Sequence, residues 1–322
     1  MKRAATTFYF ILVSFVSLGQ LPVDSIRQED IEKTLNYLTA DSLKGRGNFT
    51  PGLYTAAQFI QNEFQQAGLK TFAGFANYLQ PFHIESRKET KKDSSGAYDP
   101  SKTLVNVVGV LEGRAKRGEV IIFSAHYDHI GLQKNVVCNG ANDNASGTAA
   151  LLALAGYFAS RNDNERTLIF CAFAGEELGL HGSTAFVPFV DADSVVAVIN
   201  IEMIGKTFVG KDAFFVTGNA YSNLDKIIEK NLKGKARIRR EPDIDKELFK
   251  RSDNYPFALK GIPAHSIMSS DDSDPCYHSP CDDVKNLDIK NMTNLIRFIA
   301  IGTHTLISGK DRPKRIRVSE IK

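Results

Sequence analysis

Residues 124–131 read SAHYDHIG, residues 139–147 read NGANDNASG and residues 168–177 read LIFCAFAGEE. The stretch contains two short apolar runs, each followed by histidine or acidic side chains, as expected of buried strands that end at a functional site. Residues 146–160, between them, are rich in alanine and leucine and are predicted to form a helix. Strand, helix and strand in this order predict a parallel pair with its functional groups at one edge.

The same alternation of apolar runs and helical patterns continues on both sides of this stretch. It predicts an α/β fold with three layers, in which helices flank a mixed, mostly parallel central sheet. No repeat, low-complexity tract or linker is evident, so residues 20–322 are expected to form one domain. The predicted strands are residues 104–113, 119–128, 167–175, 194–205 and 262–270, and the predicted helices are about 24–38 with Asp24 as N-cap, 54–67, 146–160 and 178–189.

The first nineteen residues resemble a secretory signal peptide. Lys2 and Arg3 precede the apolar run FYFILVSFVSL, and small residues follow before Gln20. The run is too short to anchor the chain in a bilayer, and no cysteine follows it to accept a lipid. We therefore expect cleavage near residue 19, export to the periplasm or the medium, and no membrane association afterwards. The exported protein is expected to be a monomer.

Charge and composition point away from nucleic acid as a partner. The formal net charge is only +3 over 322 residues, too little for a basic nucleic-acid footprint. The basic run KDRPKRIR at residues 310–317 is short and is expected to be a solvated tail. Residues 38–52 are rich in turn formers and are expected to be an extended loop, and residues 87–102 to be an exposed excursion.

Four cysteines allow up to two disulfides in an exported protein. Cys276 and Cys281 lie close together in PCYHSPC, and a small loop-closing bridge between them is one expectation. A bridge between Cys138 and Cys171 is a less favoured possibility. Cysteine ligands for a metal are not expected, since the chain has no CxxC pair.

Candidate metal ligands follow the predicted strands. His126 and Asp128 end the run at 119–128, and residues two apart on a strand point to the same face. The carboxylate of Asp128 is therefore expected to hydrogen-bond the far nitrogen of His126, a common support for a metal-bound imidazole. Glu176 and Glu177 end the next strand, and their side chains diverge, so one can bind a metal while the other faces water.

Three more candidates extend this set. Glu202 ends INIE, His278 lies in the loop after the last predicted strand, and Asp143 lies in the Gly/Asn-rich turn that opens the helix at 146–160. Histidines and carboxylates gathered at one sheet edge are typical zinc ligands. The remaining histidines His129, His181, His265 and His304 are expected to be structural or exposed, and the acidic run at 271–274 to be a solvated turn.

Taken in order, AHYDHIG, GANDNASG, AFAGEELGLHGS, NIEMIG and YHSPCDDV resemble the zinc aminopeptidase family of bacterial leucyl aminopeptidase and aminopeptidase Y. LTADSLKGRGNFTPG upstream and KRSDNYPFALKGIPA downstream also resemble that family. The similarity covers about residues 31–306. The motifs are specific as a set, and much less so singly.

The resemblance implies two zinc ions bridged by Asp143, and a peptide as substrate. His126 and Glu202 would complete one ion's ligands, and Glu177 and His278 the other's. Glu176 would be the general base, and Asp128 the carboxylate behind His126. Family members often have a cis peptide after the bridging aspartate, here Asp143–Asn144.

Position 202 departs from the family pattern, which commonly has aspartate there. The extra methylene of Glu202 lengthens its reach, whereas zinc–oxygen bonds of about 2.0–2.2 Å leave little slack. Either the backbone at Glu202 lies farther from the metal, or that ion binds more weakly. The sequence leaves both possibilities open.

Three alternative functions remain open. A glutaminyl cyclase has a similar fold and would use one zinc ion, although the complete AHYD motif favours a second metal position. A carboxypeptidase or dipeptidase specificity could use the same site. A binding module on an inactive scaffold would lack a base or ligands, yet every position carries a competent side chain.

Residues 207–221 and 243–254 are expected to include the specificity pocket.

Overall fold

The computed structural model describes residues 22–84, 103–242 and 244–321. The expected signal peptide at residues 1–19 and the polar excursion at 87–102 lie outside these ranges. One sheet organises the described chain, with strand order β1-β3-β7-β4-β8-β11-β9-β10 and β2 paired to β3. The central neighbours β7, β4, β8 and β11 are parallel, and β3 joins them antiparallel.

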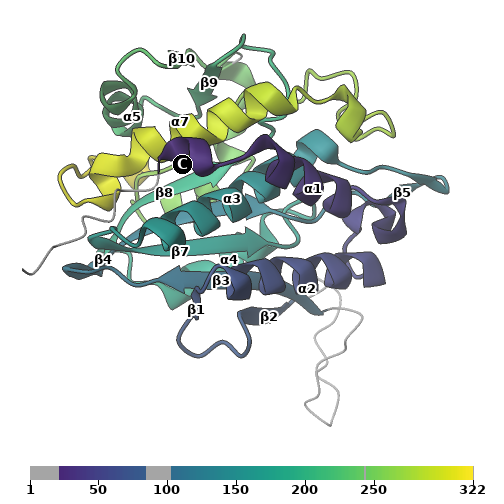
Figure 1. The fold of residues 1–322 in the computed structure, drawn as a ribbon, viewed down its shortest axis with the longest axis horizontal. Coiled ribbons are helices and arrows are strands. Elements are labelled where there is room, and N and C mark those ends of the chain that lie inside the picture. Colours follow the sequence, from purple (N-terminus) through teal and green to yellow (C-terminus); the bar gives the residue numbers. More distant parts are fainter. Residues whose placement is uncertain (1–21, 85–102, 243, 322) are drawn as a thin grey trace, which may run out of the picture.

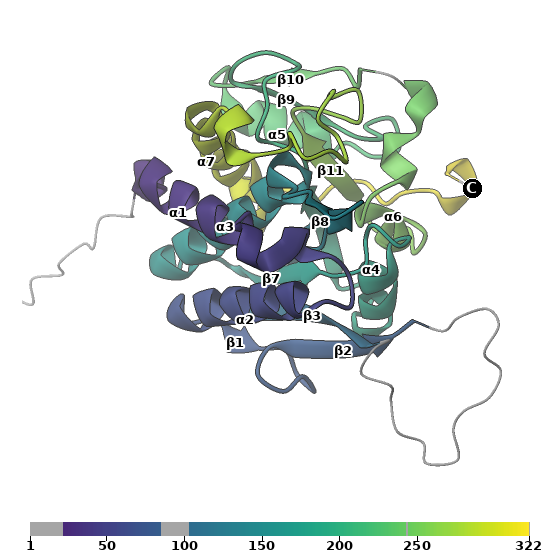
Figure 2. The same cartoon turned by 90° about the vertical axis from the view of Figure 1, so that its right-hand side faces the viewer.

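The predicted α/β fold with a mixed, mostly parallel centre is confirmed, and helices cover both faces of the sheet (Figures 1 and 2). The strands are β1 Lys70–Thr71, β2 Leu79–His83, β3 Thr103–Leu111, β4 Lys116–His126, β5 Leu132–Gln133, β6 Val136–Val137, β7 Arg166–Phe173, β8 Val195–Ile201, β9 Ala213–Val216, β10 Arg237–Arg239 and β11 Ala264–Met268. The α-helices are α1 Gln28–Leu38, α2 Pro51–Gln66, α3 Ser146–Arg161, α4 His181–Phe186, α5 Leu224–Leu232, α6 Asn254–Ala258 and α7 Ile289–Ile307.

Alternate side chains of the central strands enter two separate cores. On β7, Leu168 and Phe170 pack under helices α1, α2, α3 and α7, whereas Ile169 and Phe173 pack on the face covered by α4 and α6. This is the period-two pattern of a strand buried on both sides. Figure 2 shows the two helical layers on opposite sides of the sheet.

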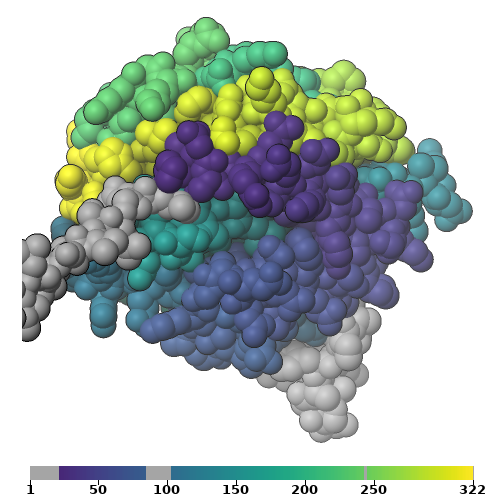
Figure 3. Space-filling model, viewed as in Figure 1, coloured from purple at the N-terminus to yellow at the C-terminus, as the bar shows by residue number. Residues whose placement is uncertain are grey.

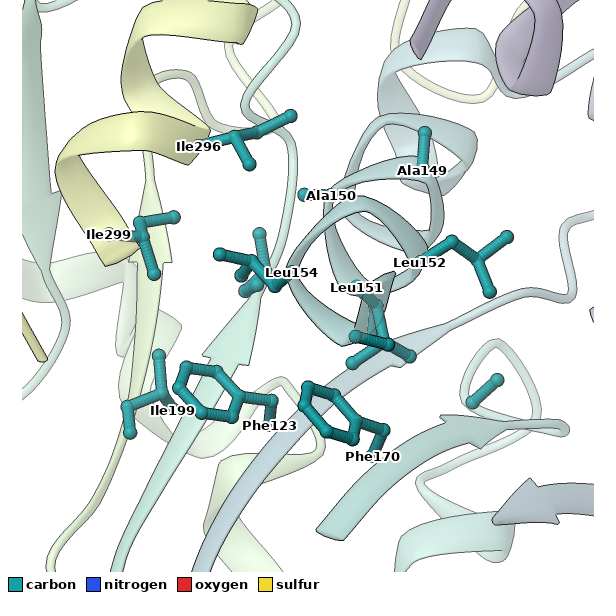
Figure 4. Close-up of a cluster of buried hydrophobic side chains, with 14 of the residues drawn as sticks. Phe123, Ala149, Ala150, Leu151, Leu152, Leu154, Phe170, Ile199, Ile296 and Ile299 are labelled. Atoms are coloured by element: carbon teal, nitrogen blue, oxygen red, sulfur yellow. The ribbon is translucent and has the colours of Figure 1, made fainter. Parts of the chain in front are cut away.

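The larger core lies between the sheet and α3. The rings of Phe123 and Phe170, on neighbouring parallel strands, stack with centroids 5.6 Å apart beneath Leu151 and Leu154 of α3 (Figure 4). Burial of each such side chain contributes roughly 1.5–3 kcal/mol. On the outer face of this layer, α1 lies between α7 and α2 (Figure 3), so helices close the core from solvent.

Several helix starts differ from the sequence-based expectations, and the helices α5, α6 and α7 were not predicted. α1 begins at Gln28, and Asp24 is in a preceding turn, η1 Val23–Ser25, so its predicted capping role is wrong. The loop expected at residues 38–52 contains the turn η2, Asp41–Arg46. α2 begins at Pro51, where Thr50 caps the helix and proline fits the first turn. α4 begins only at His181.

The basic run at residues 310–317 is not a solvated tail. Arg315 donates hydrogen bonds to the carbonyl oxygens of Ala192 and Val195, and the Ile316 side chain is buried in the smaller core. Charge and brevity suggested a tail, but Ile316 provides an apolar anchor that the run can bury. Within the described residues, no helix is long and hydrophobic enough to cross a bilayer.

His265 gives an expected pH dependence of stability. It is buried on β11, where its Nδ1–H donates to the carbonyl of Thr217 and Ser222 donates to its Nε2. Burial lowers the pKa of His265 to about 4, below about 6.5 in the unfolded chain. As pH falls, the unfolded chain binds this proton first, so stability present above pH 6.5 is lost towards pH 4.

We expect His265 to account for about 2 kcal/mol of the stability lost between pH 7 and pH 5. Urea unfolding of the wild type and His265→Asn at both pH values measures it, because asparagine keeps the donor to Thr217 and does not titrate. Equal pH dependence in the two proteins would contradict the expectation.

Candidate metal centre

The predicted gathering of functional groups at the carboxyl edge of the sheet is confirmed. His126 is the last residue of β4, Glu176 and Glu177 follow β7, and Glu202 follows β8. His278 lies in the loop after β11. Because these strands are parallel neighbours, their ends meet at one edge.

The turn Ala141–Ala145 carries Asp143 into this edge, and its two flanking asparagines hold it there. Asn144 accepts hydrogen bonds from the backbone N–H groups of Gly147 and Met203, at 2.9 and 3.1 Å. Asn142 accepts one from Gly205 at 3.0 Å. The peptide bond Asp143–Asn144 is cis, as the resemblance implied. The turn is therefore tied to the loop that carries Glu202.

Glycine is needed where α3 meets that loop. A Cβ atom on Gly147 would lie 2.2 Å from the carbonyl oxygen of Ile201, which is closer than atoms can pack. The small residue in NASG thus allows the start of α3 to approach the end of β8. This approach brings Asp143 beside the donors on β4 and β8.

Asp143 is buried, and its two carboxylate oxygens face different partners. Oδ1 lies 3.3 Å from Nε2 of His126, and Oδ2 lies 3.1 Å from Nε2 of His278. Glu177 Oε2 lies 3.0 Å from the same nitrogen of His278. Within each of two groups, the candidate ligand atoms lie within 4.8 Å of one another: His126, Asp143 and Glu202 in the first, and His129, Asp143, Glu177 and His278 in the second.

These donors fit zinc, which binds imidazole nitrogen and carboxylate oxygen. Nε2 of His126 and Nε2 of His278 are buried and have no hydrogen-bond partner among the described residues. Leaving such atoms unpaired in a protein interior is costly. A metal ion in each group, bound also by Asp143, would give each nitrogen a partner.

Charges in the cluster are strongly coupled. Burial alone would raise the pKa of Asp143, but the imidazoles of His126 and His278 hold it below its ordinary value. Burial raises the pKa of Glu176 well above its ordinary value, with His126 opposing the rise and Glu202 reinforcing it. The cluster contains more buried carboxylates than its imidazoles can neutralise, as expected where a cation binds.

Asp128 does not make its predicted hydrogen bond. Its Oδ1 lies 3.8 Å from Nδ1 of His126, which instead contacts the backbone oxygen of Asp128 at 3.2 Å. The carboxylate accepts from Asn48 at 2.7 Å and from the backbone N–H groups of Glu176 and Glu177 at 3.2 and 3.3 Å. Asp128 therefore fixes the turn that carries both glutamates.

Glu202, the departure from the family pattern, is held by a buried polar network. Its Oε2 accepts a hydrogen bond from the hydroxyl of Ser252 and lies 3.4 Å from Nδ2 of Asn200. Asn200 in turn bonds Ser252 and Ser124. Burial raises the pKa of Glu202 to about 7. The side chain of Glu202 is thus oriented by Ser252 and by Asn200 of β8.

His129, which was expected to be structural or exposed, is not exposed. It is fully buried, and its Nδ1 lies 2.9 Å from Oε1 of Glu177 and 3.7 Å from Oδ2 of Asp143. The available signal was its place directly after HYD, but a residue beyond a strand end has no orientation that spacing can predict. His181 and His304 lie outside both groups of candidate ligands.

The acidic run at residues 271–274 is also not a solvated turn. Asp271 and Asp274 are buried, and Asp272 pairs with Lys246 at 2.6 Å and with Arg251 at 2.8 Å. These partners come from the segment at 244–251, which spacing alone could not bring to the run. The pairs join two loops beside the metal centre.

The predicted bridge between Cys276 and Cys281 is present, with an S–S distance of 2.05 Å. Cys138 and Cys171 are free and buried, so the second possible bridge is absent. The bridge closes a short loop around His278. Tyr277 stacks on the ring of His278 with centroids 3.9 Å apart, so a covalent link and a stacked ring both restrain this candidate ligand.

A pocket of about 30 Å³ opens beside the cluster. Three acidic residues, Asp143, Glu176 and Glu202, line it together with apolar and charged side chains. Leu248 and Arg251 come from the predicted specificity range 243–254, whereas no residue of 207–221 lines the pocket. The other lining residues are Met203, Met268, Asp272 and Tyr277.

Sequence comparison shows which family this chain belongs to. Residues 106–301 match the model of peptidase family M28. The chain belongs to that family. Aminopeptidase YwaD of Bacillus subtilis is 23% identical over 225 residues, which cover 67% of this chain and 48% of the relative. The chain spans about half the length of the curated relatives it matches, 48–56% of the first three.

Structural comparison supports the same fold. BSAP, a zinc aminopeptidase from Bacillus subtilis, matches with a TM-score of 0.69 and 15% identity, covering 88% of this chain and 95% of that one. The glutaminyl cyclase of Porphyromonas gingivalis matches with a TM-score of 0.66 and 14% identity, covering 89% and 99%. The fold is therefore shared by peptidases and cyclases, and the function has to be argued from the site.

Proposed function

We propose that this protein is a zinc-dependent aminopeptidase with two metal ions, which removes N-terminal residues from peptides. The observation that carries the proposal is the arrangement of Asp143, whose two oxygens face two separate groups of ligands. Glu176 belongs to neither group, yet it lines the same pocket. Two metal positions, a shared carboxylate and a free carboxylate are the parts that a two-metal hydrolase uses.

His126, Asp143 and Glu202 would hold one ion, and Asp143, Glu177 and His278 the other. Bound zinc supplies Lewis acidity, which polarises the scissile carbonyl and lowers the pKa of water. Asp128 accepts a hydrogen bond from the backbone N–H of Glu176 and so helps to hold the Glu176 carboxylate at the pocket. Asp128 acts through that backbone and is a positioning residue.

In this mechanism, Glu176 accepts a proton from the attacking water as the water oxygen bonds to the carbonyl carbon. When the C–N bond breaks, Glu176 returns the proton to the leaving amine. Its oxygen Oε2 lies 4.0 Å from Nε2 of His126, close to the first group but outside it. The free N-terminus of the peptide and its first side chain would occupy the pocket that Met203, Leu248 and Tyr277 line.

A cyclase of glutaminyl peptides is the second candidate, because that activity is named for two solved structures with this fold. It would need one zinc ion. Both groups of candidate ligands are present in this chain, including the one that contains His126 of the AHYD motif, which favours the hydrolase. A carboxypeptidase would share the site and bind the carboxyl end of the substrate, and a dipeptidase would bind both ends of a dipeptide.

The first experiment is hydrolysis of three matched peptides, with a free N-terminus, an acetylated N-terminus and an N-terminal glutamine. We expect the purified chain to release the first residue from the free peptides and to leave the acetylated one intact. A chelator should abolish release, and added zinc should restore it. Cyclisation of the glutamine peptide without cleavage would instead establish the cyclase, and release from the carboxyl end a carboxypeptidase.

We also infer that the protein is exported, with residues 1–19 as its signal, and that it acts as a monomer. Support for export comes from the bridge between Cys276 and Cys281, because disulfides persist in oxidising compartments. Size-exclusion chromatography and N-terminal sequencing of the secreted protein test these two points.

A further inference from the structure

We propose that His129 is the fourth protein ligand of the second metal position, together with Asp143, Glu177 and His278. The second position is then closed by protein, whereas the first has three protein ligands and keeps an open place for water or substrate. This inference rests on the proposed two-metal centre. It adds a ligand that neither the sequence motifs nor the resemblance supplied.

The distances around His129 fit one shared ion. Four ligands at about 2.0–2.1 Å from a tetrahedral zinc ion lie about 3.3 Å from one another. Nδ1 of His129 is 2.9 Å from Oε1 of Glu177 and 3.7 Å from Oδ2 of Asp143. On the other side, Nε2 of His278 is 3.1 Å from the same oxygen of Asp143. All four ligand atoms lie within 4.8 Å of one another.

The two imidazoles approach the acidic groups from different directions. The rings of His129 and His278 lie 5.4 Å apart between centroids and at 76° to each other. His278 comes from the disulfide-closed loop, and His129 from the loop after β4. Donors arriving from separate directions can surround an ion, which stacked donors on one side could not do.

The chain holds His129 in this position from both sides. Its backbone N–H donates to the carbonyl oxygen of Arg46 at 3.2 Å, and its backbone pairs with that of Gly47. On the opposite side, a Cβ atom on Gly140 would lie 2.5 Å from the ring. The glycine therefore leaves the space that the imidazole fills beside Asp143.

The ring of His129 offers Nδ1, and not Nε2, to the acidic cluster. Nε2 of His129 is buried and has no hydrogen-bond partner in the described part of the chain. The polar contacts that the structure shows for this ring run through Nδ1 to Glu177 and Asp143. The ring is thus fixed by its backbone and by packing, and it presents Nδ1 to the acidic cluster.

The asymmetry has a chemical consequence. Zinc sites closed by four protein ligands are typically structural, and sites with three keep a reactive position. The ion next to His129 would therefore bind more tightly and exchange more slowly. The ion between His126 and Glu202 would be the one that a weak chelator removes first.

The test uses the metal-free protein, titrated with zinc against a chromophoric chelator, with three variants. His129→Ala removes the ring, and His129→Asn places an amide N–H near the position of Nδ1, a nitrogen that can donate to Glu177 but does not bind zinc. We expect both to lower the tighter of two affinities by at least about 100-fold, more than an outer-shell change usually does. His304→Ala, an exposed histidine of α7, should leave both affinities unchanged.

Cadmium-substituted protein with nitrogen-labelled histidine gives a second readout, the scalar coupling between the metal nucleus and Nδ1 of His129. Coupling to one of two bound ions would support the inference. If His129→Asn kept the tight affinity while His129→Ala lost it, the residue would only donate to Glu177, and the inference would be overturned. Two bound ions without coupling to Nδ1 of His129 would overturn the ligand role of His129 and leave the two-metal centre standing. A single bound ion would overturn the two-metal centre, and with it this inference.

Discussion

Replacement of Glu176 by glutamine is expected to lower kcat about 10²–10⁴-fold, the range typical of a lost general base. Glutamine has nearly the same shape but cannot accept the proton from water. Since Glu176 is outside both groups of candidate ligands, the variant should still bind its metal ions. Rates with a free-N-terminus peptide, together with zinc content, measure both effects.

Glu177→Gln is the matched control, because the two residues are adjacent and their backbone N–H groups bond the same carboxylate of Asp128. It weakens a candidate ligand, so zinc content should fall along with activity. A Glu176→Gln protein that turns over peptide at the wild-type rate would remove Glu176 from the mechanism. Loss of metal from that variant would make it a ligand instead.

Replacement of Arg46 by methionine is expected to cost about 4 kcal/mol or more of folding free energy. Arg46 is fully buried, although it is an arginine. Its guanidinium donates to four backbone carbonyl oxygens, those of Leu38, Tyr127, Asn139 and Gly140, at 2.6–2.9 Å. Each buried acceptor left without a donor costs about 1–3 kcal/mol.

The same variant should lose zinc, because the carbonyl groups of Tyr127 and Gly140 belong to the segments that carry His126 and Asp143. Urea unfolding and zinc content measure the two effects. Arg27→Met provides the control: Arg27 is an exposed arginine paired with Asp30 on the surface, and its loss should leave the unfolding midpoint almost unchanged. Wild-type stability in the Arg46→Met protein would show that water replaces the guanidinium.

The sheet and most of the site could be predicted from sequence for one physical reason. Buried parallel strands are continuous apolar runs, and their carboxyl ends meet at one edge. His126, Glu177 and Glu202 could thus be placed together before their contacts were known. The short strands at Lys70–Thr71 and Arg237–Arg239 were missed because two or three partly exposed residues have no periodicity.

What sequence could not predict depends on loops packed against distant segments. His129 is oriented by Arg46, and Asp271 is buried beside Lys246. In each case the partner lies far away in the chain, and no spacing rule connects the two. Asp128 was assigned to the right region with the wrong partner, since its carboxylate bonds the backbone of the next strand's loop instead of an imidazole.

The shared position of Asp143 also has a consequence for folding. The candidate ligands extend from residue 126 to residue 278 and come together only when β4, β7, β8 and β11 are paired. Such long-range contacts form late and make folding slow. An unfolded chain offers no comparable site, so zinc binds the native state almost exclusively and stabilises it by mass action. The melting temperature of this protein is therefore set partly by the free zinc concentration around it.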